Sequence, residues 1–158
     1  MNKIKILVMD VDGTLTDGKI YMGENGELFK AFDAKDGLGI NMILPQHDIM
    51  PIVLTGRKSK IVENRCSELN ITHIIQGSKN KEEELTRLLQ ELQVDYSMVA
   101  YIGDDVADYG AMKKCAVKGC PNDAVKEIRE ISDCVTDAKG GAGAVREFIE
   151  WIVSRENS

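Results

Sequence analysis

The chain has 158 residues, of which 43% are hydrophobic and 29% are charged. These proportions are typical of a globular protein with a substantial core and exclude a disordered chain. The formal net charge of −6 argues against nucleic acid as a partner. No apolar run approaches the ~20 residues of a membrane span, and Asp10 and Asp12 interrupt the run where a signal-peptide core would lie. We therefore expect one domain over residues 1–158, located in the cytoplasm, with neither membrane nor nucleic acid as a partner.

The cysteines form no Cys-x-x-Cys pair anywhere in the sequence. In a reducing compartment such residues stay reduced, and we expect them to be mainly structural. A zinc site is the alternative that their residue type leaves open. They are Cys66, Cys115, Cys120 and Cys134.

The first predicted element is a buried strand over residues 4–9, followed by Asp10, Asp12 and Gly13. Ligands of open α/β sheets bind just beyond the carboxyl ends of strands. Because successive strand side chains point to opposite faces, the two carboxylates converge only if the backbone turns, which Gly13 permits. Two carboxylates so close repel each other unless a proton or a cation such as Mg²⁺ lies between them. The alternative is that this run forms only a turn or a helix start.

The next segment predicts a β-hairpin over about residues 19–33, because Glu24-Asn25-Gly26 separates two apolar-rich runs. We expect its strands near residues 19–22 and 27–33. A helix over residues 36–44 follows, with Asp36 as its N-cap and Pro45 as its end.

Strands and helices then alternate to the end of the chain, which predicts a parallel, doubly wound sheet of the α/β class. Further strands are expected at residues 48–54, 72–75, 98–102, 115–118 and 134–136. Further helices are expected at residues 59–69 and 81–92, after Asp108 to about residue 114, and at residues 123–131 and 144–154. The glycines of residues 140–143 predict a flexible segment within the C-terminal stretch 139–154, with a plain linker as the alternative.

Polar residues follow two of these strands. Thr55 and Arg57 come directly after one strand, and the planar guanidinium of Arg57 suits a phosphate or a carboxylate. Asp104, Asp105 and Asp108 follow another strand, a pattern that is hard to explain by structure alone. Alone, Thr55 could be a plain helix cap.

Together these motifs resemble those of the haloacid dehalogenase superfamily of phosphotransferases. The resemblance implies that Asp10 attacks phosphorus and that Asp12 is the general acid and base. It implies that Thr55 binds the transferring phosphoryl group and that Lys81 neutralises the nucleophile and phosphate, although a lysine at a helix start is often only solvated. These four residues are the expected catalytic set.

The same resemblance implies an Mg²⁺ cofactor. Its expected ligands are a carboxylate oxygen of Asp10, the backbone carbonyl of Asp12 and the carboxylate of Asp104. Asp105 and Asp108 are expected to bind metal-bound water or to orient Lys81. The implied fold is the Rossmann-like superfamily core with a small hairpin, because about twenty residues are too few for a cap domain.

Within the superfamily, the chain resembles the 3-deoxy-D-manno-octulosonate 8-phosphate phosphatase family over nearly its whole length. The resemblance rests on residues 21–23, 32–40, 55–66, 76–77 and 140–147. It implies a capless homotetramer whose subunits help close each other's sites. The implied substrate contacts are Asp33, Ala34, Lys35, Asp36, Gly37, Arg57, Arg65 and Lys81.

Three positions depart from that family's pattern, and they leave the exact sugar open. Asp33 often corresponds to Asn in the family, and Lys35 and Asn41 often correspond to Arg. The expected activity is Mg²⁺-dependent hydrolysis of a 2-keto-3-deoxy sugar acid phosphate through an aspartyl-phosphate. The alternatives are a sialic-acid-type 9-phosphate phosphatase, disfavoured by Arg57, and a non-catalytic oligomerisation module of a sugar-acid activation pathway.

Overall fold

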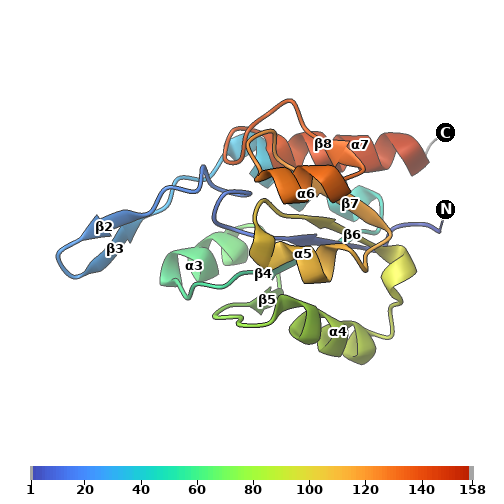
Figure 1. The fold of residues 1–158 in the computed structure, drawn as a ribbon, viewed down its shortest axis with the longest axis horizontal. Helices are drawn as coiled ribbons and strands as arrows, with labels where there is room; N and C mark the ends of the chain where they lie inside the picture. Colours follow the sequence, from blue (N-terminus) through green and yellow to red (C-terminus); the bar gives the residue numbers. More distant parts are fainter. Residues whose placement is uncertain (1, 157–158) are drawn as a thin grey trace.

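The computed structural model describes residues 2–156 and contains a six-stranded sheet in the order β5-β4-β1-β6-β7-β8 (Figure 1). All neighbouring strands of this sheet pair in parallel, as the alternation of elements predicts. The strands are β1 (Ile6–Met9), β4 (Met50–Leu54), β5 (His73–Ile75), β6 (Val99–Ile102), β7 (Val117–Cys120) and β8 (Cys134–Val135).

Helices cover both faces of the sheet, and alternate residues of β1 separate the two cores. Leu7 and Met9 pack with one set of helices, and Ile6 and Val8 pack with the other. The first set is α1 (Ala34–Leu38), η1 (Gly39–Ile43), α2 (Leu44–Gln46), α3 (Lys60–Glu68) and α7 (Ala144–Glu156). The second set is α4 (Lys81–Leu92), α5 (Val106–Met112) and α6 (Lys126–Ile131), and the short 3₁₀ helix η2 (Tyr96–Met98) precedes β6.

The strand order brings three carboxyl ends together. Strand β1 lies between β4 and β6, and Met9 pairs with Val53 on one side and with Ile102 on the other. The segments that follow these strands therefore meet at one edge of the sheet, where ligands of such folds bind.

The hairpin consists of β2 (Tyr21–Gly23) and β3 (Gly26–Phe29) and extends away from the sheet as a separate arm (Figure 1). Its strands are shorter than predicted from the sequence. The rings of Tyr21 and Phe29 stack with centroids 4.3 Å apart. Met22, Leu28 and Phe29 are 59%, 63% and 50% exposed, so the arm presents an apolar surface.

Two predictions for the helix after the hairpin are wrong. Asp33, and not Asp36, is the N-cap, because its carboxylate accepts hydrogen bonds from the amides of Lys35 and Asp36 at 2.8 and 3.1 Å. Pro45 does not end the helical segment, which continues as α2 to Gln46. Proline is tolerated there because it lies in the first turn of α2.

Two later boundaries also differ from the predicted ones. Strand β7 begins at Val117, because the amide of Cys115 donates to Met112 O at 3.0 Å and closes a turn first. Helix α6 begins at Lys126, because the amide of Ala124 closes another turn with Pro121 O at 3.1 Å.

The glycine-rich segment packs tightly at its start instead of forming the predicted flexible segment. A Cβ at Gly140 would overlap the backbone carbonyl of Gly13. The amide of Gly141 donates to Thr14 O at 3.2 Å, and Gly141 has a φ of 73°, which glycine adopts readily. These glycines therefore allow two backbones to approach closely.

The four cysteines are buried, and none of them is paired in a disulfide. Within residues 2–156, no helix has the length and apolar character needed to cross a bilayer.

Candidate active site

Asp10 lies directly after β1 and is 6% exposed. Its backbone amide donates to Ile102 O at 3.1 Å, which continues the pairing of β1 with β6. Its Oδ1 accepts a hydrogen bond from Lys81 Nζ at 3.0 Å. Burial and the nearby Asp108 carboxylate raise the pKa of Asp10 well above its usual value, while Lys81 opposes the rise. The carboxylate therefore needs positive charge beside it to act as an anion.

A tight turn after Asp10 determines where Asp12 and Gly13 lie. Val11 O accepts hydrogen bonds from the amides of Thr14 and Leu15 at 3.1 and 2.9 Å. Gly13 has a φ of 91°, and a Cβ there would overlap the Asp104 carboxylate. Glycine is thus needed at this position both for the backbone conformation and for the approach of Asp104.

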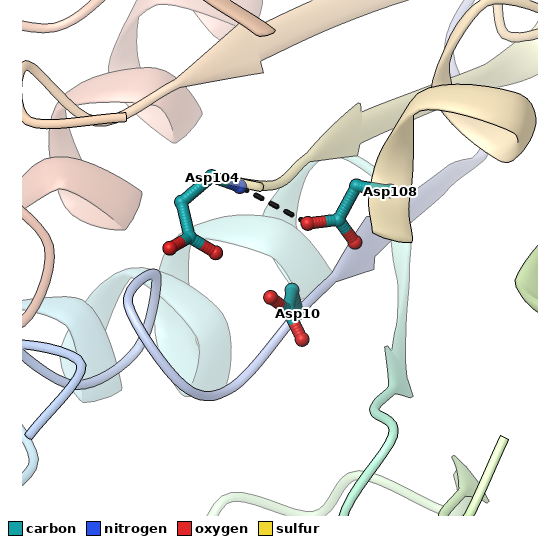
Figure 2. A group of neighbouring side chains, drawn as sticks. All are labelled: Asp10, Asp104 and Asp108. Carbon is teal, nitrogen blue, oxygen red and sulfur yellow. Dashed lines mark hydrogen bonds between the residues drawn. The ribbon is translucent and has the colours of Figure 1, made fainter. Parts of the chain in front are cut away.

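Figure 2 shows the carboxylates of Asp10, Asp104 and Asp108 turned toward one another from β1, the end of β6 and α5. One oxygen of each lies within 4.8 Å of the others. Burial raises the pKa of Asp104 to about 6, while a hydrogen bond from the Thr14 hydroxyl opposes the rise. A divalent cation between Asp10 and Asp104 would relieve the repulsion between their carboxylates.

The oxygens of Asp108 are already engaged by protein donors. Oδ1 accepts from Lys81 Nζ and from Tyr101 OH, each at 2.7 Å. Oδ2 accepts from the amide of Asp104 at 3.1 Å, the bond drawn in Figure 2, and from the amide of Asp105 at 3.3 Å. Asp108 therefore orients Lys81, which leaves Asp10 and Asp104 as the carboxylates that fit an oxygen-seeking ion such as Mg²⁺.

Asp105 is the N-cap of helix α5. Its carboxylate accepts from the amide of Val106 at 2.7 Å and forms a capping box with Asp108 at the start of α5. Such a cap satisfies backbone donors that the helix itself leaves free.

Thr55 follows β4 in a rigid turn. Its amide donates to Ile75 O at 2.9 Å, its carbonyl accepts from the amide of Ser78 at 3.1 Å, and the residue is 1% exposed. It borders an open cleft of about 370 Å³. The predicted site residues that line this cleft are Asp10, Asp12, Thr55, Arg57 and Lys81. The structure thus brings the four expected catalytic residues and Arg57 together.

Lys81 reaches the cleft from the first turn of α4. This helix begins after its N-cap Asn80, whose side chain accepts from the amide of Glu83 at 3.1 Å. Burial lowers the pKa of Lys81, but Asp10 and Asp108 outweigh this effect and the net shift is upward. Lys81 is therefore a buried ammonium group between two carboxylates.

The remaining predicted substrate residues do not line this cleft. Asp36 is 1% exposed, and its Oδ1 accepts from the amide of Arg146 at 2.9 Å. Gly37 packs against the guanidinium of Arg65. The residues concerned are Asp33, Ala34, Lys35, Asp36, Gly37 and Arg65, and their role toward substrate stays a prediction.

Glu27 of β3 and Lys30, which directly follows β3, form an ionic network with Asp12 although no sequence motif marks them. Lys30 Nζ lies 2.6 Å from Asp12 Oδ1 and 3.0 Å from Glu27 Oε2, and its side chain is 2% exposed. Arg57 Nε is 4.0 Å from Asp12 Oδ2. Two cations therefore face the Asp12 carboxylate.

Residues 53–149 match the model of the haloacid dehalogenase-like hydrolase family. Together with the parallel sheet and the aspartates at its carboxyl edge, this match shows that the chain belongs to the haloacid dehalogenase-like hydrolases. Within that class, it belongs to the 3-deoxy-D-manno-octulosonate 8-phosphate phosphatase family. It is 45% identical over 150 residues to the phosphatase KdsC of Escherichia coli (strain K12). The aligned region covers 95% of this chain and 79% of KdsC.

Solved structures of the same family are similar throughout. The cobalt-bound phosphatase of Haemophilus influenzae has a TM-score of 0.93 and 37% identity, covering 98% of this chain and 90% of that one. The phosphatase of Moraxella catarrhalis, solved with magnesium, phosphate and KDO (3-deoxy-D-manno-octulosonate), has a TM-score of 0.93 and 41% identity. That match covers 98% of this chain and 88% of the other. Magnesium is thus found in a close relative, in agreement with the predicted cofactor.

Proposed function

We propose that this protein is an Mg²⁺-dependent phosphatase that hydrolyses 3-deoxy-D-manno-octulosonate 8-phosphate. The observation that carries the proposal is the buried Asp10 carboxylate, which lies at the cleft with Lys81 Nζ 3.0 Å away and Asp104 beside it. Such a carboxylate can attack phosphorus and so divide one difficult displacement into two. The similarity to KdsC supports the choice of substrate.

In the first half-reaction, an oxygen of Asp10 attacks phosphorus, and the bond from phosphorus to the sugar oxygen breaks. Asp12 gives its proton to that sugar oxygen, so the sugar acid leaves as a neutral alcohol at this position. Lys81 and the Thr55 hydroxyl stabilise charge on the phosphoryl oxygens. The products of this step are aspartyl-phosphate at Asp10 and a deprotonated Asp12.

In the second half-reaction, Asp12 takes a proton from a water molecule, which attacks phosphorus and releases inorganic phosphate from Asp10. The Asp12 carboxyl is then protonated again for the next cycle. The carboxylates of Asp10 and Asp104 and the Asp12 carbonyl would hold Mg²⁺, which offsets negative charge on the phosphoryl group and the nucleophile. Arg57 borders the cleft and would pair with an anionic group of the substrate.

We also propose that the protein assembles as a homotetramer in the cytoplasm through its hairpin arms. The exposed Met22, Leu28 and Phe29 support this assembly, because apolar surface of this kind is stabilised when covered. A neighbouring subunit would also cover the open cleft of a capless fold. The four free cysteines support a location in a reducing compartment, where thiols persist without pairing.

The test is phosphate release from a panel of phosphomonoesters, measured with Mg²⁺ and with excess EDTA. The panel contains the octulosonate 8-phosphate, a sialic acid 9-phosphate, glucose 6-phosphate and p-nitrophenyl phosphate. We expect the highest kcat/KM for the octulosonate 8-phosphate and loss of activity with EDTA. A higher kcat/KM for the sialic acid 9-phosphate would contradict the proposed substrate. No phosphate release from any of the esters would contradict the proposed phosphatase activity.

A further inference from the structure

The arm residue Lys30 is buried against the general acid and base of the proposed reaction. Its side chain is 2% exposed although it belongs to a hairpin whose neighbouring residues Leu28 and Phe29 are largely exposed. Burying an ammonium group costs considerable desolvation free energy unless close anions compensate it. Here Asp12 Oδ1 at 2.6 Å and Glu27 Oε2 at 3.0 Å provide that compensation.

Glu27 connects this lysine to the body of the protein. Its Oε1 accepts a hydrogen bond from Ser59 Oγ at 2.7 Å, and Ser59 is the residue before α3. A continuous chain of polar contacts thus runs from α3 through Ser59, Glu27 and Lys30 to Asp12. Each link has the length of a good hydrogen bond, so the chain defines one position for the Asp12 carboxylate.

Arg57 is a weaker support for Asp12. Its Nε lies 4.0 Å from Asp12 Oδ2, and its side chain is 47% exposed. An exposed pair at that distance contributes little. Without Lys30, the carboxylates of Asp12 and Glu27 would repel each other across the space that the ammonium now fills, and Asp12 would rotate away.

We propose that Lys30 is a positioning residue for this enzyme: it holds the Asp12 side chain in the orientation needed for proton transfer at the reacting oxygens and anchors the hairpin arm to the site. The inference rests on the proposed function, because it concerns the proton transfer assigned to Asp12. A misplacement of about 1 Å in such a group can cost about 100-fold in rate. The effect depends on how strongly the leaving group needs protonation.

The test compares Lys30→Met, which keeps length and removes charge, with Lys30→Arg, which restores charge. The control is Lys19→Met, an exposed lysine of the same arm. We expect Lys30→Met to lower kcat for the octulosonate 8-phosphate about 10- to 100-fold with a smaller change in KM. The loss on p-nitrophenyl phosphate should be only a few-fold, because nitrophenolate leaves without a proton.

Lys30→Arg should recover part of the lost rate, and Lys19→Met should match the wild type. Equal losses on the two substrates in a folded Lys30→Met protein, or no loss, would overturn the proposal. If Lys30→Met does not fold, the same comparison of substrates in Lys30→Arg decides, since its longer fork also displaces Asp12. A wild-type protein that is inactive on every ester would instead reject the proposed function.

A crystal structure of the Lys30 variant that folds tests the geometric claim separately from activity. We expect the Asp12 carboxylate to change its orientation while the backbone of residues 10–14 stays in place. An unchanged Asp12 side chain would overturn the proposal whatever the kinetics show.

Discussion

Asp10 and Asp12 are one residue apart, yet their surroundings differ in a way that suits two chemical roles. Asp10 is 6% exposed and faces Lys81, Asp104 and the cleft. The Asp12 side chain is 20% exposed and faces Lys30 and Arg57. Paired carboxyl groups in unlike environments commonly divide nucleophilic and proton-transfer work between them.

The role of Asp12 predicts a dependence on the leaving group. Asp12→Asn should lower kcat for the octulosonate 8-phosphate by about 10²- to 10⁴-fold, because the amide cannot transfer the proton. The loss should be smaller with p-nitrophenyl phosphate. Steady-state phosphate release with both substrates measures the difference, and losses of the same size would contradict the acid role.

Asp36 predicts a pH dependence of stability. Burial, together with Asp33, raises its pKa from 3.8 to about 6, while the Arg146 amide opposes the rise. Because the folded-state pKa is the higher one, the folded protein binds this proton more tightly, and stability falls as pH rises from about 4 to about 6. The full loss is about 3 kcal/mol, at about 1.4 kcal/mol for each pKa unit.

Asp36→Asn should remove this dependence, since the amide does not ionise and its oxygen can still accept from the Arg146 amide. Urea unfolding of wild type and variant at several pH values between 4 and 7.5 measures it. Glu91→Gln, at an exposed position of α4, is the control and should follow the wild type. Parallel curves for wild type and Asp36→Asn would show that Asp36 titrates normally.

At the level of elements, the glycine-rich segment of residues 140–143 packs against the turn of residues 10–14 that carries Asp10 and Asp12. Gly140 lies against the carbonyl of Gly13, and Gly141 donates to Thr14. Gly13 in turn lies against the Asp104 carboxylate. A displacement of this segment would therefore shift Gly13 and, through it, the proposed metal ligand Asp104.

Gly140→Ala should consequently disturb both stability and metal use. The added methyl group has no space, which typically costs about 1–3 kcal/mol of stability. We expect a lower melting temperature and a higher Mg²⁺ concentration for half-maximal activity. Ala142→Ser, at an exposed position of the same segment, is the control. Unchanged Mg²⁺ dependence in Gly140→Ala would disprove the connection to the metal site.

The sequence predicts those site residues that come within two positions of the end of a strand. Asp10, Thr55 and Asp104 follow β1, β4 and β6, and parallel pairing places such positions at one edge. Lys30 could not be predicted, because its contact with Asp12 depends on the direction in which the hairpin leaves the sheet. The predicted flexibility does not hold at Gly140 for a related reason: glycine indicates flexibility and close packing equally well, and only the tertiary contact with Gly13 distinguishes them.

The N-cap of α1 shows the limit of local patterns. Asp33 and Asp36 both precede possible helix starts, and cap preference alone does not choose between them. In the structure, Asp33 binds the first free amides, and Asp36 is turned inward to the Arg146 amide on α7. A contact between residues 110 positions apart thus decides where this helix begins.

For the whole molecule, the apolar arm predicts dependence on assembly. Leu28→Glu places a charge on the most exposed apolar position of the arm and should dissociate the proposed tetramer. We expect a lower molar mass by light scattering and a lower kcat/KM, because the cleft loses its cover. Val135→Glu, at a half-exposed position outside the arm, is the control. A fully active monomeric Leu28→Glu protein would contradict the proposed closure by a neighbouring subunit.

The most direct measurement for covalent catalysis by Asp10 is phosphate release by Asp10→Asn. The amide is a poor nucleophile, so turnover of the octulosonate 8-phosphate with Mg²⁺ should fall to background. Circular dichroism on the same sample should show an unchanged fold, because Asn preserves the size of this buried side chain. Substantial phosphate release by a correctly folded Asp10→Asn protein would contradict an aspartyl-phosphate formed at Asp10.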